Sequence, residues 1–341
     1  MRVLVTGHLG YIGAVLVPRL MALGHEVHGL DSGLYDGCDF GPAPAPIPAL
    51  RLDVRDVETR HLEGFDGVIH LAALSNDPLG DLDAELTYDI NYRASVRLAS
   101  CAREAGVRRF LFSSSCSLYG AAGEAPLDEA APFAPQTPYG ESKILTEQEL
   151  TKLADAEFSP VYLRNATVYG SSPRLRCDVV VNNLVGYALT TGEVLLKSDG
   201  TAWRPLVHVE DVCSAFVALL SAPREAIHDR AFNIGRTEEN YRIRDVARIV
   251  EKEVAGTRLR IEAGASSDTR NYRVDFQRIL SEIPVFDPRW TVADGARQLH
   301  EDYRTHGMTA ERFESPRFFR IRTVRARQAA GTLGVDLRPI T

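Results

Sequence analysis

Residues 137–143, "TPYGESK", place a tyrosine and a lysine one helical turn apart. Tyr139 and Lys143 are four positions apart, so on a helix their side chains lie on the same face. A free phenol has a pKa of about 10 and is a poor base near neutral pH, but a neighbouring ammonium group favours the phenolate and lowers that pKa. The pair therefore predicts a general acid/base that takes a proton from a hydroxyl or returns one to a carbonyl.

A group of small hydroxyls lies at residues 113–120, "SSSCSLYG", directly after the apolar run 109–112. This change is typical of a buried strand that ends in a polar loop. The serines offer hydrogen-bond donors for a reacting oxygen, and Cys116 stands among them. The residue types alone do not choose one hydroxyl from the run, nor do they assign a role to the thiol.

The sequence "TGHLGYIG" at residues 6–13 carries three regularly spaced glycines, Gly7, Gly10 and Gly13, between an apolar β-type run and a helical pattern. Glycine permits a tight turn, close approach of a pyrophosphate to the backbone, and close packing of helix on strand. The amides of this loop, those of Tyr11 and Ile12 included, and the dipole of the following helix favour an anion. The pattern predicts a dinucleotide site.

Two aspartates bear on the cofactor. Asp31 ends the second β-type run, where a carboxylate accepts hydrogen bonds from the adenosine ribose and repels a 2′-phosphate. The residues 32–34 that follow it include no arginine, so we expect NAD and not NADP. Asp53, which precedes Val54, either accepts from the adenine amino group or caps a helix, and the sequence supports both roles equally.

Strand and helix patterns alternate over the first half of the chain, which predicts a parallel sheet of Rossmann type covered by helices on both faces. The expected helices span 10–24, 86–105 and 140–155. The expected strands span 2–7, 26–31, 49–54, 67–73, 109–115 and 160–170.

The regular alternation weakens after about residue 170, which indicates a smaller lobe interwoven with the main domain. We expect an NAD-binding domain over 1–172 that carries the catalytic residues, and a substrate-binding lobe over 173–308. Within that lobe, 203–235 is expected to return in part to the main domain. A basic and aromatic extension, 309–341, follows, and two interpretations of it stay open. It is either an amphipathic helix with solvated arginines, or a basic flap that reaches a subunit partner or an anionic ligand.

Composition excludes several classes of protein. The net charge of −7 argues against a nucleic-acid-binding protein, which normally has a basic face. No apolar run reaches the ~18–20 residues of a membrane helix, and the start of the chain has no secretory pattern, so we expect a cytoplasmic protein. Five scattered cysteines without a paired motif predict reduced thiols and no metal site.

Several ordered motifs together resemble the extended short-chain dehydrogenase/reductases, and within them the NAD-dependent nucleotide-sugar epimerases and dehydratases. These motifs are "TGHLGYIG", "LDV" at 52–54, "HLAA" at 70–73, "INYRAS" at 90–95, "FLFSSSCSLYG", "PYGESK", "WRPLVHVEDV" at 203–212 and "AFNIG" at 231–235. The resemblance covers nearly all of residues 1–300. It implies bound NAD, a nucleoside-diphosphate sugar as substrate, hydride removal from a sugar hydroxyl, and a homodimer formed through 86–105 and 140–155.

The resemblance also implies residue roles. Tyr139 is the base, Lys143 orients the cofactor ribose and lowers the phenol pKa, and Ser115 hydrogen-bonds the reacting oxygen. Asn91 supports the helix that bears Tyr139. The full set of cofactor positions is Gly7, Gly10, Tyr11, Ile12, Gly13, Asp31, Asp53, Val54, Leu71, Ala72, Ala73, Asn91, Ser113, Tyr139 and Lys143. Expected substrate contacts are Ser75, Asn76, Ser115, Cys116, Ser117, Thr167, Arg174, Asn183, Arg204 and Arg270, with Arg176 as a further phosphate candidate.

Departures from the family pattern narrow the activity. Dehydratases of this family carry Asp and Glu directly after the catalytic hydroxyl, where this chain has Cys116 and Ser117. Thr167 replaces an asparagine common in relatives. We therefore expect an epimerase that works through a transient ketosugar, with a ketosugar reductase or a non-catalytic NAD-binding protein as alternatives. Cys116 either packs under its loop or moves a proton next to the ketone, and we expect packing.

Overall fold

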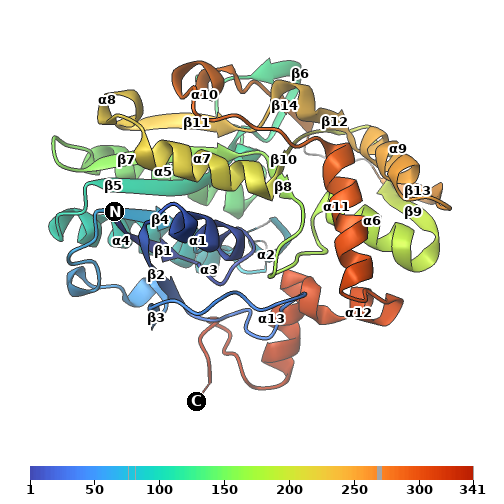
Figure 1. The fold of residues 1–341 in the computed structure, drawn as a ribbon, viewed down its shortest axis with the longest axis horizontal. Helices are drawn as coiled ribbons and strands as arrows, with labels where there is room; N and C mark the ends of the chain where they lie inside the picture. The colour runs from blue at the N-terminus through green and yellow to red at the C-terminus, as the bar shows by residue number, and fades with distance from the viewer. Residues whose placement is uncertain (76, 81, 267–270, 341) are drawn as a thin grey trace.

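The computed structural model describes residues 1–75, 77–80, 82–266 and 271–340 (Figure 1). Its main sheet has seven strands in the order β11-β7-β5-β4-β1-β2-β3, and every neighbouring pair is parallel. The strand order grows outward from β1 in both directions, which is the expected Rossmann-type arrangement. The strands are β1 (Arg2–Thr6), β2 (Glu26–Asp31), β3 (Ala49–Arg51), β4 (Gly67–His70), β5 (Arg109–Ser115), β7 (Ser159–Asn165) and β11 (Arg230–Ile234).

Helices cover both faces of this sheet, because its strands carry apolar side chains on both faces. In β1, Val3 and Val5 join the core that includes Phe216 of one helix layer. Leu4 points the other way and joins the core that includes Leu98 of the opposite layer. The first layer contains α1 (Gly13–Ala22) and α7 (Val209–Ser221); the second contains α4 (Ala94–Glu104) and α5 (Pro138–Leu153).

A third core lies beside the sheet and holds the second half of the chain together. Its elements form short sheets, β12-β10-β8 and β13-β9, packed by helices, and a further pair is β14-β6. The strands are β6 (Ala121–Leu127), β8 (Thr167–Tyr169), β9 (Glu193–Ser198), β10 (Trp203–His208), β12 (Asn240–Arg242), β13 (Arg258–Ser266) and β14 (Asn271–Val274). The helices of this part are α6 (Val180–Thr191), α9 (Ile243–Glu253) and α11 (Val292–Thr305).

Two expected elements are divided in the structure. The run 160–170 forms β7 and β8, because the chain leaves the main sheet at Ala166 and Thr167 pairs instead with Leu206 of β10. The helix expected at 86–105 begins as α3 (Ala84–Tyr88), widens into a π-turn at Asp89–Arg93 and continues as α4. The remaining short helices are α2 (Asp77–Gly80), α8 (Arg224–Ile227) and α10 (Gln277–Glu282).

The C-terminal extension is more divided than a single amphipathic helix. It contains α12 (Ala310–Glu314), a 3-10 turn at Pro316–Phe318 and α13 (Arg320–Ala329). Phe313 and Phe318 are buried, as the packing interpretation predicts, but Arg320 is buried with them. In Figure 1 this red segment lies below the β2–β3 edge of the sheet.

Within the described ranges, none of the helices is both long and apolar enough to cross a membrane. The same residues place no three His, Cys, Asp or Glu side chains together as a metal site. All five cysteines are free thiols.

Candidate functional site

A cavity of about 740 Å³ opens at the carboxyl ends of β1, β2, β4 and β5. The strand order reverses between β1 and β4, and open α/β sheets bind ligands at that point. The wall includes most of the residues that the sequence singled out. They are Gly7, Gly10, Tyr11, Ile12, Gly13, Asp31, Asp53, Val54, Leu71, Ala72, Ala73, Ser75, Ser113, Ser115, Ser117, Tyr139, Lys143, Thr167, Arg176, Asn183 and Arg204.

The glycine loop has no room for a side chain at Gly7 or at Gly13. Gly7 has a φ of +71°, and a Cβ on it would lie 2.8 Å from the backbone nitrogen of Ala72. A Cβ on Gly13 would overlap the backbone of Gly7 and His8 at the start of α1. The backbone of β1, α1 and the loop after β4 can approach closely only because these side chains are absent. This cradle fits the pyrophosphate of a dinucleotide.

Asp31 ties the loop after β2 to the glycine loop. Its Oδ1 accepts from the amide of Gly33 at 2.8 Å, and its Oδ2 accepts from the amide of Leu9 at 3.1 Å. The carboxylate keeps further lone pairs at the cavity wall, where ribose hydroxyls can donate. This geometry is consistent with the expected preference for NAD.

Asp53 has the cap role that the sequence left open, and the adenine contact stays a prediction. Its Oδ1 accepts from the amide of Arg55 at 2.9 Å and so caps the 3-10 turn Val54–Asp56, which replaces the end of the strand expected at 49–54. The Arg55 guanidinium also pairs with this carboxylate at 2.7 Å. Asp53 still lines the cavity, so its cap role leaves it in reach of an adenine amino group.

Ser115, Tyr139 and Lys143 lie on the same cavity wall, from the end of β5 and the first turns of α5. Thr137 caps α5, accepting from the amide of Gly140 at 3.2 Å, and Pro138 occupies the first helical position. Ser115 Oγ accepts from the Ser117 amide at 3.1 Å and stands 3.1 Å from the Ser117 hydroxyl.

Lys143 is nearly fully buried. Its Nζ donates to the Ser113 carbonyl at 2.8 Å and lies 5.7 Å from the centre of the Tyr139 ring. Burial lowers the pKa of Lys143 to about 7, against a smaller raising effect of Glu147. An ammonium at this position favours the phenolate form of Tyr139.

A buried ion pair between α5 and β7 supports the hydroxyl loop, residues 113–120. Glu147 of α5 pairs with Arg164 of β7 at 2.6 Å and accepts from Ser114 Oγ at 2.5 Å. Arg164 also donates to the Tyr119 hydroxyl at 3.1 Å. The loop, α5 and β7 are therefore fixed relative to one another by a network in which Ser114 lines the cavity and Glu147 and Arg164 lie behind it.

Cys116 does not line the cavity, which agrees with the expected packing role and does not support its expected contact with substrate. The side chain is 0% exposed and packs in the core of the first helix layer. Its Sγ donates to the Arg164 carbonyl at 3.1 Å, and burial raises the pKa of the thiol well above its usual value. Cys116 opens the 3-10 turn Cys116–Tyr119, and this turn directs its side chain into the core.

Asn91 is fully buried and does not line the cavity, so the structure does not support its place among the cofactor contacts. It lies in the π-turn and joins three segments. Its Oδ1 accepts from the Leu74 amide at 2.7 Å, and its Nδ2 donates to the Ser142 hydroxyl of α5 at 3.4 Å. Asn91 therefore supports the helix that bears Tyr139, as the resemblance implied.

The substrate side of the cavity is built by β8, α6 and β10. Asn183 of α6 donates to the Cys177 carbonyl at 2.9 Å, and Arg204 of β10 lies 5.7 Å from the Tyr272 ring centre. Both side chains, and Thr167, line the cavity. His208 is a packing residue, as expected, because it is buried and stacks on Trp290 with the ring centres 3.9 Å apart.

Arg174 does not line the cavity, so the structure does not support its expected phosphate contact. Its Nη1 donates to the Tyr35 carbonyl at 2.7 Å and its Nε pairs with Asp39 at 3.2 Å. Arg176, two residues later, lines the cavity instead. The other two expected contacts, Asn76 and Arg270, lie outside the described residues.

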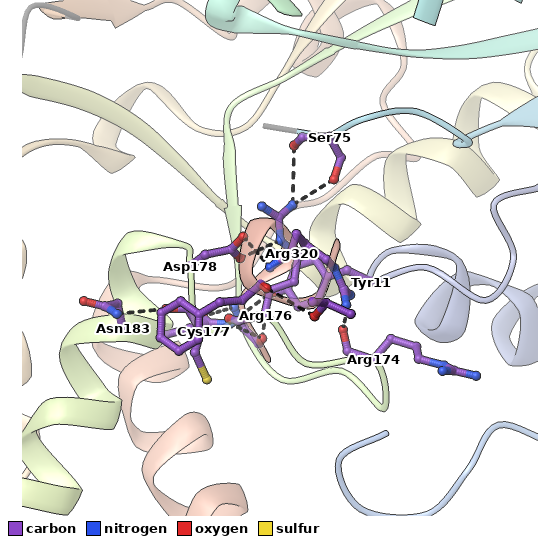
Figure 2. A network of polar contacts seen from close by, with 12 residues as sticks. Tyr11, Ser75, Arg174, Arg176, Cys177, Asp178, Asn183 and Arg320 are labelled. Carbon is purple, nitrogen blue, oxygen red and sulfur yellow. Dashed lines mark hydrogen bonds and ion pairs between the residues drawn. The ribbon is translucent and has the colours of Figure 1, made fainter. Parts of the chain in front are cut away.

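Arg176 belongs to a polar network with residues that sequence reasoning missed (Figure 2). Its Nε donates to Asp178 at 2.9 Å and its Nη1 reaches the Ser75 hydroxyl at 3.3 Å. Burial acts to raise the pKa of Asp178, but the Arg176 guanidinium outweighs it and lowers that pKa. Arg320 of α13 joins the network, and Asn165 and Phe319 also line the cavity.

Comparison with known proteins gives one family. The model of the NAD dependent epimerase/dehydratase family matches residues 3–235. The UDP-glucose 4-epimerase of Mycolicibacterium smegmatis is 31% identical over 315 residues, which cover 89% of this chain and 99% of that protein. The UDP-glucose 4-epimerase of Lacticaseibacillus casei is 28% identical over 330 residues, which cover 89% of this chain and 98% of that protein.

A similar solved structure is MoeE5 in complex with UDP-glucuronic acid and NAD. It is 28% identical, has a TM-score of 0.78, and the match covers 89% of this chain and 99% of that one. The cofactor expected from Asp31 agrees with the NAD of this complex. The chain therefore belongs to the NAD-dependent epimerase/dehydratase family, and its cofactor is NAD.

Proposed function

We propose that this protein is an NAD-dependent epimerase of a nucleoside-diphosphate sugar, which oxidises the sugar at C4 to a transient ketosugar and reduces it again from the opposite face. One observation carries the proposal: Ser115, Tyr139 and Lys143 line the same cavity as the glycine loop and Arg204. The names of the relatives, which are UDP-glucose 4-epimerases, support a UDP-sugar and C4.

In the proposed reaction, the protein takes one proton from the sugar during oxidation and returns it during reduction. Bound NAD supplies the acceptor and donor of the hydride. The Tyr139 phenolate takes the proton of the C4 hydroxyl while the C4–H bond breaks, and it returns that proton when the carbonyl is reduced. Ser115 Oγ donates a hydrogen bond to the reacting oxygen, and the Lys143 ammonium, 5.7 Å from the Tyr139 ring centre, favours the phenolate.

The positions of the carboxylates on the cavity wall support epimerisation at C4 over elimination of water. Among the described wall residues, the carboxylates are Asp31, Asp53 and Asp178. The first two accept from backbone amides on the adenosine side, and Asp178 is paired with Arg176. That described wall offers no imidazole. A reaction that removes a proton from C3 or C5 needs a further base, whereas C4 epimerisation needs only the tyrosine.

The test is incubation of the purified enzyme with UDP-, dTDP-, CDP- and GDP-linked hexoses in deuterated water, followed by NMR and absorbance at 340 nm. The proposal expects one pair of C4 epimers, no deuterium at C3 or C5, and no net NADH. Consumption of NADH in proportion to product would identify a reductase instead. As a control, Tyr139→Phe should keep its NAD and lose about 10²- to 10⁴-fold in kcat.

The assembly and location form part of the proposal. Free cysteines and the NAD requirement support a cytoplasmic protein of carbohydrate biosynthesis. We propose an NAD-binding domain over 1–172, a substrate lobe over 173–308, and a homodimer through the outer faces of α4 and α5. Light scattering tests the dimer, since a monomeric mass at micromolar concentration would contradict it.

A further inference from the structure

The C-terminal extension, defined as residues 309–340, reaches the cofactor side of the cavity although it lies outside the matched family region. The family model ends at residue 235. The two curated relatives align over 98–99% of their own length but over only 89% of this chain. Arg320, Phe319 and Leu337 of the extension nevertheless line the cavity. Part of the site is therefore built by a segment that the family match does not include.

Arg320 is buried beside the cavity, and one nitrogen of its guanidinium group makes no hydrogen bond with the described residues. The residue is 1% exposed, its guanidinium carbon lies 4.1 Å from the centre of the Tyr35 ring, and its Nη2 donates to the Arg174 carbonyl at 3.0 Å. Its Nη1 is buried without a hydrogen-bond partner among the described residues. An arginine does not deprotonate in proteins, so this buried donor keeps its charge.

Among the described residues, the ion pairs near Arg320 leave its guanidinium without a carboxylate partner. Asp178 pairs with Arg176 at 2.9 Å, and Asp39 pairs with Arg174 at 3.2 Å. In Figure 2, Arg176, Asp178 and Arg320 lie next to one another in the network. Asp178 thus pairs with the Arg176 guanidinium and accepts from the backbone amide of Arg320 at 3.3 Å, while no ion pair among the described residues includes the Arg320 guanidinium. A buried cation without a counter-charge is costly, so the site calls for an anion in the cavity.

The position of Arg176 and Arg320 indicates which anion the cavity would bind. The Arg176 guanidinium carbon lies 6.0 Å from the centre of the Tyr11 ring in the glycine loop. Tyr35, under Arg320, belongs to the loop after β2, which follows the ribose carboxylate of Asp31. Arg176 thus lies beside the loop whose amides are shaped for a pyrophosphate, and Arg320 lines the same cavity over Tyr35, on the adenosine side.

The tip of the extension closes the adenine side. Leu337 is 3% exposed, lines the cavity, and packs in the same core as Val54. Two contacts hold it there: Arg338 pairs with Asp56, and Arg55 donates to the Asp336 carbonyl at 2.9 Å. Leu337 has a φ of +60°, a conformation that costs a leucine energy and that these contacts maintain.

We infer that the C-terminal extension is a built-in closure of the NAD site, in which Arg320 binds the cofactor pyrophosphate and Leu337 covers the adenine. The inference rests on the cofactor and not on the sugar or on the proposed epimerase activity. Removal of the Arg320 side chain should weaken only ligands that carry the cofactor phosphates, whereas removal of the Leu337 side chain should weaken every ligand that carries adenine.

The test measures binding of ADP, adenosine and UDP to the NAD-free enzyme by calorimetry. Arg320→Met should weaken ADP about 10- to 100-fold, the effect of losing a charge-assisted hydrogen bond, and leave adenosine and UDP unchanged. The matched control is Arg325→Met, which removes an exposed arginine of the same helix. Equal losses for ADP and adenosine, or a loss for UDP instead of ADP, would overturn the assignment to the cofactor pyrophosphate.

A second variant separates binding from folding. Leu337→Gly suits the left-handed backbone and removes only the side chain. It should weaken ADP and adenosine by the same factor, about tenfold, and shorten the retention of NAD during gel filtration, measured as NAD per chain. Unchanged adenosine affinity and NAD retention in this variant would show that the extension is no closure. Circular dichroism of each variant shows whether it is folded.

Discussion

Replacing Cys116 by alanine tests whether the thiol of the hydroxyl loop acts in chemistry or in packing. Its 0% exposure and the hydrogen bond of Sγ to the Arg164 carbonyl predict packing. Burial, with a further contribution from Glu129 and Glu147, raises the thiol pKa, so the thiolate needed for proton transfer is disfavoured. We therefore expect Cys116→Ala to keep kcat within about threefold of the parent enzyme, far from the 10²-fold or larger loss of an acid/base.

The magnitude of the stability loss follows from the volume removed. Deleting one buried sulfur leaves a methyl-sized void, which costs about 1–2 kcal/mol, or about 1–3 °C in Tm for a chain of this length. Cys213→Ala is the matched control, because Cys213 is also 0% exposed in the same core but lies on α7.

The assay is kcat with the substrate found in the panel, next to Tm by calorimetry. Equal falls in Tm and unchanged kcat for both variants support packing. A loss of more than 100-fold in kcat for Cys116→Ala alone would refute the reasoning and indicate proton transfer next to the ketone.

Three further predictions concern groups around the cavity. Glu147→Gln leaves Arg164 buried without its counter-charge, so the free energy of unfolding in urea should fall by about 3–5 kcal/mol, whereas the more exposed Glu149→Gln should cost under about 1 kcal/mol. Lys143 has a folded-state pKa of about 7, below its unfolded value, so the unfolded chain binds the extra proton above pH 7. The stability of the NAD-free enzyme should therefore rise with pH between about 7 and 10 relative to Lys143→Met, and parallel pH curves would contradict this. Asp31→Asn removes the charge that repels a 2′-phosphate, so the ratio of NADP to NAD affinity in titrations should rise at least about tenfold, and an unchanged ratio would assign that selectivity elsewhere.

The cofactor half of the site was predictable because its signals are local. Gly7 and Gly13 are required by backbone clashes within one turn and its neighbours, and Asp31 follows from its place at the end of β2. The parallel sheet follows from strands and helices that alternate over short distances. The spacing of Tyr139 and Lys143 is likewise a property of one helix.

The parts that sequence reasoning placed wrongly, or missed, depend on contacts between distant segments. Arg174 and Arg176 are two residues apart in one loop, and only the folded surroundings decide which of them faces the cavity. An arginine in a basic segment is normally solvated, so nothing in the local pattern marks Arg320 as buried. Its partners Tyr35 and Asp178 lie far away in the sequence, on segments that the extension meets only after folding.

The most direct test of epimerisation through a bound ketosugar follows the hydrogen at C4 of the sugar. The enzyme is given its nucleotide sugar with deuterium at C4, in ordinary water, and the epimer is examined by NMR and mass spectrometry. We expect the epimer to keep the deuterium at C4, because the hydride leaves and returns within one cavity. Loss of the label to solvent, or its recovery in free NADH, would contradict epimerisation through a bound ketosugar.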